Sequence, residues 1–181
     1  AVTVTLGAGR GEVAAWIARI SAGAAARVTA GVGDDIRALG AMIGTASAVV
    51  LADQRAGRLD FLGIGTKDRA QYVMAADREN DRVAALHDPL HPAVLRAIDH
   101  TVTAAHAADA WVGMCGEMAG DPALTSLLVG LGLDELSMSA VTVPAVKARV
   151  TETDTEDAAA LAADALACST REEVRALLEL D

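Results

Sequence analysis

Five short aliphatic segments, separated by longer stretches with helical spacing, constrain the fold of this chain more than any other feature of its sequence. Strands of a parallel sheet are covered on both faces, so they read as brief apolar runs, and the chain returns between them through helices. The alternation therefore predicts an α/β fold with a parallel sheet and helices on its outer face. The expected strands are Val2–Leu6, Leu39–Ile43, Leu59–Ile64, Ala110–Met114 and Glu135–Met138.

Helical spacing is clearest in two segments between these strands, Glu12–Ile20 and Ala93–Ala108. Each carries an apolar stripe that is expected to face the core. The stripes consist of Val13, Trp16, Ile17 and Ile20 in the first segment, and of Val94, Leu95, Ile98 and Val102 in the second. Residues 21–35, rich in Ala and Gly, are expected to form a loop or a poorly specified segment. Three further helices are expected after the last strand, at Val143–Val150, Thr155–Cys168 and Thr170–Leu180.

The number of βα units leaves two architectures open. A closed eight-stranded α/β barrel uses about 250 residues and eight units, whereas this chain has 181 residues and five expected strands. Either the sheet is open, or the chain is a partial (β/α)8 barrel, its last five βα units followed by extra C-terminal helices. No repeat or Pro/Ser-rich linker divides the sequence, so residues 1–181 are expected to form a single domain.

Composition excludes several classes of function. The chain has 15 Lys and Arg against 25 Asp and Glu, a formal charge of −10, and no nucleic-acid or anionic-membrane partner is expected because both require a basic face. Its longest apolar stretches, such as Leu124–Leu133, fall short of the roughly 20 residues that span a bilayer. The two cysteines, Cys115 and Cys168, are too few for a disulfide framework, and no export signal is visible, so a cytoplasmic setting is expected.

Functional residues of parallel α/β folds gather just past the C-terminal ends of the strands. The third expected strand leads into Gly63–Arg69 (GIGTKDR) and the fourth into Gly113–Glu117 (GMCGE). Both segments combine glycines, which let backbone come close to a ligand, with ionisable side chains. Taken alone, a tight turn with a solvated Lys and Asp is the simpler interpretation of the first segment.

Four ordered segments nevertheless resemble the phosphoenolpyruvate (PEP)-utilising enzymes. Residues 60–78 (DFLGIGTKDRAQYVMAADR) are similar to the second signature of that family, and DPLHPAVLRAI, WVGMCGEMAGDP and GLGLDELSMSA follow in the expected order. Within the family, the GMCGE and MAGD sequences are most similar to those of Enzyme I of the sugar phosphotransferase system. The resemblance runs roughly from Leu39 to the C-terminus, and four motifs in order form a specific signal.

The resemblance implies a PEP site at the mouth of a (β/α)8 barrel and the activity of a phosphoenolpyruvate-protein phosphotransferase. The phosphoryl group would pass to a histidine on a separate swivelling domain and then to the histidine-carrier phosphoprotein, releasing pyruvate. We expect that domain and the first barrel strands to lie outside this chain, and a homodimer or a complementary chain to complete the barrel. The alternative is a truncated, degenerate homologue without catalysis that acts as a dimerisation or regulatory module.

The resemblance also assigns roles to residues. Cys115 falls on the position of the catalytic acid that protonates the pyruvate enolate, a reaction open to a thiol that stays protonated until needed. Asp68 falls on a ligand position for Mg²⁺, the expected cofactor, and Arg78 on a position that grips the charged groups of the substrate. Lys67 departs from the family pattern: either it binds substrate as a fixed point charge for phosphate where a metal is lost, or it marks the decay of a site no longer used.

The sequence departs from the family pattern near this expected site. Gly44 stands where the family has the glutamate that supplies the second carboxylate to Mg²⁺, and Lys67 stands where it has an asparagine. Binding of Mg²⁺ is therefore expected to be weakened. Gly63 and Arg69 replace the usual serine and leucine, the second placing a charge where the family is apolar. The histidines are expected to be surface residues rather than phosphoryl acceptors; they are His87, His91, His100 and His106.

Overall fold

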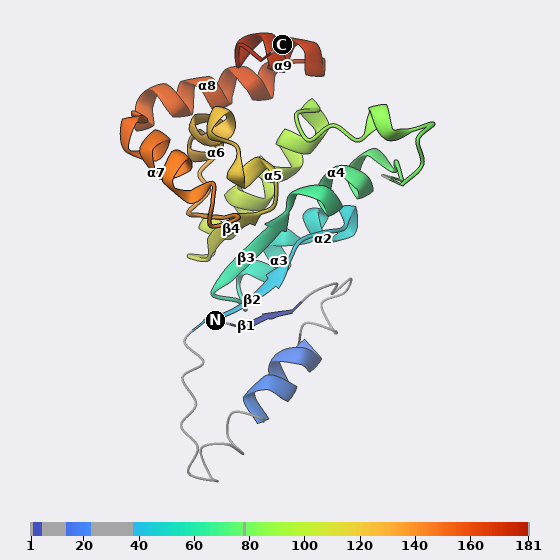
Figure 1. Ribbon diagram of the computed structural model, residues 1–181. Coiled ribbons are helices and arrows are strands. Elements are labelled where there is room, and N and C mark those ends of the chain that lie inside the picture. Colours follow the sequence, from blue (N-terminus) through green and yellow to red (C-terminus); the bar gives the residue numbers. More distant parts are fainter. Residues whose placement is uncertain (1, 5–13, 23–37, 78, 181) are drawn as a thin grey trace.

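Five parallel strands form one sheet in the computed structural model, which describes residues 2–4, 14–22, 38–77 and 79–180 (Figure 1). The strands are β1 (Val2–Val4), β2 (Leu39–Met42), β3 (Phe61–Gly65), β4 (Trp111–Cys115) and β5 (Glu135–Ser137). All five expected strands are confirmed. Each strand pairs with its neighbour in sequence, which is the order of a barrel, whereas a doubly wound sheet reverses its order near the middle. The fold is therefore a partial (β/α)8 barrel.

Helices cover the outer face of this sheet. Those between the strands are α2 (Ala46–Val50), α3 (Ala52–Ala56), α4 (Thr66–Met74), α5 (Pro92–His106) and α6 (Thr125–Gly130). Short 3-10 turns lie at Ala84–Leu86, Met118–Gly120 and Pro122–Leu124. The expected C-terminal helices are confirmed as α7 (Val143–Glu152), α8 (Thr155–Ala167) and α9 (Arg171–Leu177), with α8 packed beside α6 (Figure 1).

The core lies between the outer face of the sheet and helix α5. The apolar stripe of α5 is buried as expected, and Pro92 begins the helix at a position where its missing N–H costs nothing. The N–H group of Ala93 donates to Nδ1 of His91, which caps the helix. Opposite the stripe, β3 and β4 turn alternate side chains toward the helices, as the period of two in a strand requires; they are Leu62, Ile64, Val112 and Met114.

The N-terminal expectations are met only in part. Residues 14–22 are helical, yet Trp16 is 43% exposed and does not face the core. Its ring instead lies 4.9 Å from the guanidinium carbon of Arg19, a cation–π contact that suits an amphipathic side chain at the surface. Ile17 does pack against the core. Val13 and residues 23–37, which include most of the expected loop, lie outside the described residues.

The inner face of the sheet is lined by aromatic rings and glycines. Phe61 and Trp111 stack with their ring centroids 4.3 Å apart. A Cβ atom on Gly40 would overlap the Phe61 ring, so the absence of a side chain there makes room for the aromatic pair. A hollow of about 180 Å³ lies on this face beside Met42 and Cys115. In a closed barrel this face is the interior.

The contact between α6 and α8 provides a test of this packing. A Cβ atom on Gly130 would overlap the backbone carbonyl of Ala158, which cannot move without displacing α8. We expect Gly130→Ala to lower the free energy of unfolding by about 2 kcal/mol or more, as measured by urea denaturation. Gly57→Ala is the matched control, because Gly57 has φ of −64° and no atom within 4 Å of its Cβ position. Equal urea midpoints for the two variants would contradict the packing described.

Candidate functional site

The residues singled out from the sequence meet at the C-terminal ends of three adjacent strands. Gly44 follows β2, Lys67 and Asp68 lie in the first turn of α4 directly after β3, and Cys115 ends β4. Because β3 and β4 pair up to their last residues, their ends lie side by side. Arg78 lies outside the described residues, so its expected role stays a prediction.

Thr66 and Gly116 fix the ends of β3 and β4 relative to each other. The Thr66 hydroxyl donates a hydrogen bond to the carbonyl oxygen of Cys115 at 3.0 Å. Gly116 adopts φ of +112°, a conformation that favours glycine, and a Cβ atom there would lie 3.1 Å from Thr66 Oγ1. The tight turn after β4 is thus matched to the threonine that begins α4. It holds Cys115 close to the first turn of that helix.

The two positions expected to ligate a metal are neighbours, but only one carries a carboxylate. A Cβ atom on Gly44 would lie 3.7 Å from Cβ of Asp68, at ordinary contact distance. The two positions therefore lie side by side, and Gly44 contributes no side chain, as the sequence already indicates. Among the described residues, no group of three or more His, Cys, Asp or Glu side chains could hold a metal ion.

Cys115 presents an exposed thiol at this strand end. Partial burial, followed by the negative charges of Asp68 and Glu135, raises the pKa of Cys115 above that of an ordinary thiol. The group therefore holds its proton at neutral pH, which suits an acid rather than a nucleophile. Cys168, in contrast, is the C-cap of α8, and its thiol donates to the carbonyl of Asp164 at 3.4 Å.

Lys67 forms an ion pair across the strand ends that the sequence did not reveal. Its Nζ lies 2.9 Å from Oε1 of Glu117, and this ammonium, which donates a hydrogen bond, lowers the pKa of the Glu117 carboxyl. The Lys67 carbonyl oxygen accepts a hydrogen bond from Nε2 of His87 at 3.0 Å. Lys67 and Glu117 line a cavity of about 810 Å³, together with Ser137 and Thr142 near β5.

Arg69 explains how a charged residue is tolerated at an apolar family position. Its side chain is fully buried and donates hydrogen bonds to the carbonyl of Ile43 at 2.5 Å and to the carbonyl of Ala97 and the hydroxyl of Thr101, both at 3.3 Å. Burial lowers the pKa of Arg69 to about 10, so the guanidinium stays charged at neutral pH. Because Ile43 directly precedes Gly44, Arg69 secures the end of β2 to α5.

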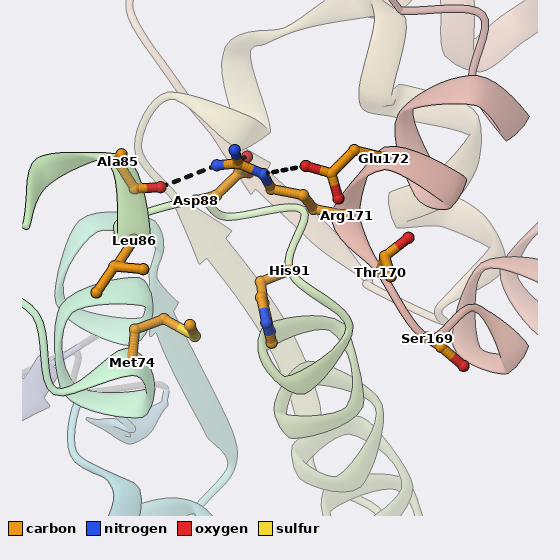
Figure 2. Close-up of a pocket in the computed structure, with 9 residues that line it drawn as sticks. All are labelled: Met74, Ala85, Leu86, Asp88, His91, Ser169, Thr170, Arg171 and Glu172. Carbon is orange, nitrogen blue, oxygen red and sulfur yellow. Dashed lines mark hydrogen bonds and ion pairs between the residues drawn. The ribbon is translucent and has the colours of Figure 1, made fainter.

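The loop that carries His87 is fixed from its other side by helix α9. Figure 2 shows Arg171 reaching this loop, where it donates to the carbonyl of Ala85 at 2.8 Å and lies 3.7 Å from the carboxylate of Asp88. Its Nε also lies 2.7 Å from Glu172, and this contact raises the pKa of Arg171. These groups border a second cavity of about 380 Å³. Since Arg171 already has its partners, the described residues that line this cavity offer no spare Lys or Arg.

The remaining histidines do not lie at the strand ends. His91 caps α5, and His100 is exposed on the same helix. His106, also exposed, lies 2.9 Å from the carboxylate of Asp134 near the end of α5. Of the four described histidines, His87 is the one bonded to a residue of the strand ends, through the Lys67 carbonyl.

Comparison with known proteins gives consistent matches. Residues 15–155 match the family described as "PEP-utilising enzyme, PEP-binding domain". A phosphoenolpyruvate-protein phosphotransferase of Haloferax volcanii is 62% identical over 151 residues, covering 83% of this chain and 27% of that protein. The enzyme of the same name from Enterococcus faecalis is 49% identical over 149 residues, covering 82% and 26%. The chain thus spans about a quarter of the length of these relatives.

The likeness to solved structures concerns the fold. A crystal structure of a citrate lyase from Burkholderia xenovorans matches with a TM-score of 0.61 and 17% identity, covering 98% of this chain and 61% of that one. None of the described helices is long and apolar enough to cross a membrane.

The charge environment of Cys115 can be tested by its reactivity. Alkylation requires the thiolate, so a raised pKa slows the reaction below the pH at which Cys115 ionises. Asp68→Asn removes one of the negative charges that raise this pKa. We expect the rate of Cys115 alkylation by iodoacetamide at pH 8 to rise, because a lower pKa leaves more of the thiol as thiolate. Mass spectrometry measures both cysteines, and Cys168 serves as the internal control. An unchanged or slower rate at Cys115 would refute this account.

Proposed function

The chain belongs to the family of PEP-utilising enzymes, as a PEP-binding domain, and from this premise we propose that it is the PEP-binding portion of a phosphoenolpyruvate-protein phosphotransferase. The observation that carries the proposal is the placement of Cys115, Asp68 and Lys67 around one set of strand ends, beside a cavity of about 810 Å³. A protonated thiol can donate a proton to an enolate, and an ammonium can bind an anionic substrate.

Substrate binding rests on groups that suit a phosphate and a carboxylate. The Lys67 ammonium supplies a positive charge, and the hydroxyls of Ser137 and Thr142 line the same cavity. Gly65 precedes α4 without a capping side chain, so the first N–H groups of that helix are not occupied by a cap. Arg78 follows shortly after α4 in the sequence, and we propose that it adds the second positive charge.

Cys115 would act after the phosphoryl group has left. The enolate of pyruvate takes the thiol proton at carbon, so a C–H bond forms while the S–H bond breaks and leaves a thiolate. Asp68 and Glu135 favour the protonated thiol before this step. Because Cys115 is exposed, solvent can return the proton afterwards. The phosphoryl acceptor is proposed to be a histidine on another domain, which passes the group to the histidine-carrier protein.

The residues present do not fit the Mg²⁺ ion that the family resemblance implies. Gly44 offers no ligand beside Asp68, and the ammonium of neighbouring Lys67 opposes a divalent cation. We therefore route no step of the reaction through a metal. Asp68 retains a role through its charge, which acts on the thiol of Cys115.

A second candidate function is a non-catalytic dimerisation or regulatory module. Two observations favour it: Gly44 in place of a ligand, and the inner face of the sheet, where Trp111 is half-buried and Glu135 exposed. In a closed barrel this face is covered by the remaining strands. We propose that a second copy of the chain or a complementary chain supplies this cover. Binding of PEP at Cys115 distinguishes the two candidates.

The proposal predicts protection of Cys115 by substrate. PEP or oxalate should slow alkylation of Cys115 while leaving Cys168 unaffected, because only Cys115 lies at the strand ends. The same protein should release no pyruvate from PEP by itself, since the phosphoryl acceptor is proposed to lie on another domain. Equal labelling of Cys115 with and without saturating PEP would rule out a substrate site there and favour the non-catalytic module.

Restoring the family residues should restore metal binding. A side chain at position 44 would meet Asp68 at ordinary contact distance, so a glutamate fits there. We expect the double variant Gly44→Glu with Lys67→Asn to bind Mn²⁺ at least about tenfold more tightly than the unmodified chain, because two carboxylates replace one and the ammonium is removed. Calorimetric titration measures both. Tight binding by the unmodified chain would contradict this interpretation of both substitutions.

A further inference from the structure

Lys67 is not freely available to an incoming anion, because the carboxylate of Glu117 already binds it at 2.9 Å. We propose that Glu117 is an internal competitor of the anionic substrate for the Lys67 ammonium and thereby sets the affinity of this site for phosphate. The inference rests on the proposed function, since it concerns the same cavity. It assigns to Glu117 a role that depends on a lysine at position 67.

The position of Lys67 is not explained by the stability of its helix. A positive charge in the first turn of an α-helix faces the positive end of the helix dipole, which disfavours it. Lys67 nevertheless stands second in α4, and its side chain is 52% exposed and lines the cavity. Its backbone carbonyl is held by His87. The backbone is thus anchored while the ammonium can still change partners.

The backbone that follows β4 places Glu117 beside Lys67. The turn at Gly116, whose φ of +112° is fixed against Thr66, places the next residue over the cavity. Glu117 is followed by a 3-10 turn, and its side chain is 79% exposed. Its only ion pair among the described residues is the one with Lys67. The carboxylate is therefore held at the ammonium by a single contact.

The charges around the cavity make its affinity for phosphate depend on this competition. The described lining residues include one cation, Lys67, and two carboxylates, Glu117 and Asp121. Asp121 is already engaged, since it accepts a hydrogen bond from the N–H group of Ala123 at 2.9 Å. A phosphate that enters while Glu117 keeps Lys67 meets net negative charge. It gains the ammonium only when Glu117 releases it.

Displacement is feasible because the pair is exposed. Ion pairs in contact with water contribute little, and a dianion attracts an ammonium more strongly than a single carboxylate does. The phosphate of the substrate can therefore replace Glu117. The competition lowers the affinity for phosphate by a limited factor, about fivefold for a surface pair of this kind.

The test compares variants of the whole 181-residue chain. Glu117→Gln removes the competitor, Lys67→Met removes the ammonium, and a double variant combines them. Glu152→Gln is the matched control, because Glu152 lies in a similarly exposed ion pair with Arg149 away from the cavity. Calorimetry measures binding of inorganic phosphate and of PEP at low salt with EDTA present. The rate of Lys67 acetylation, read by mass spectrometry, reports on the free ammonium without any ligand.

We expect Glu117→Gln to bind both anions about fivefold more tightly and to acetylate faster at Lys67. Lys67→Met and the double variant should bind equally weakly, and Glu152→Gln should match the unmodified chain. Tightening that persists without Lys67, or that Glu152→Gln reproduces, overturns the inference. Phosphate binding that follows this pattern without any binding of PEP supports the competition and overturns the proposed function. PEP binding that is unaffected by the changes at Lys67 and Glu117 supports the proposed function and overturns the competition. No binding of either anion by any variant overturns both proposals.

Discussion

The alignment of β3 with β4 is the constraint on which the site depends. The two strands pair up to their last residues, and the Thr66 hydroxyl bonds to the carbonyl of Cys115 where they end. Helix α4 begins at that point without an intervening loop, so Lys67 and Asp68 are carried directly to the thiol. A shift of one residue in this pairing would turn Cys115 toward the helices and remove it from the site. The backbone register of β3 and β4 thus determines whether the Cys115 side chain lies at the site.

Strands and long helices were predictable because their patterns are local. Each strand is a brief apolar run, and the stripe of α5 repeats at helical spacing over 15 residues. Helix α4 was not predicted, since Arg69 lies buried on its inner side and interrupts the apolar pattern. Trp16 was placed in the core by its spacing, although its exposed ring contacts Arg19 instead. Pattern arguments fail where a polar group is buried or an amphipathic one stays at the surface.

The same distinction holds for the site. Family motifs identified Cys115 and Asp68 and the empty position at Gly44, and the structure brings all three to adjacent strand ends. The pairing of Lys67 with Glu117 was not predictable, because the two residues lie far apart in sequence and meet only through the register of β3 and β4. The charge balance of the site therefore follows from tertiary structure. The motifs alone identified residues of the site but did not reveal which charged side chains form ion pairs.

Sequential strand order has a consequence for how such a chain can be divided. Among the described residues, every strand pairs only with its neighbours in sequence, so each βα unit adds one strand pairing to the sheet. In this respect the partial barrel resembles a repeat protein, whose stability is approximately a sum over adjacent units. A break between two units removes one strand pairing, together with the helix contacts across it such as that of α3 with α5, and leaves the other strand pairings intact. Polypeptides with this topology are accordingly suited to being split and reassembled at unit boundaries, and a site that extends from β2 to β5 survives any division that keeps those four strands together.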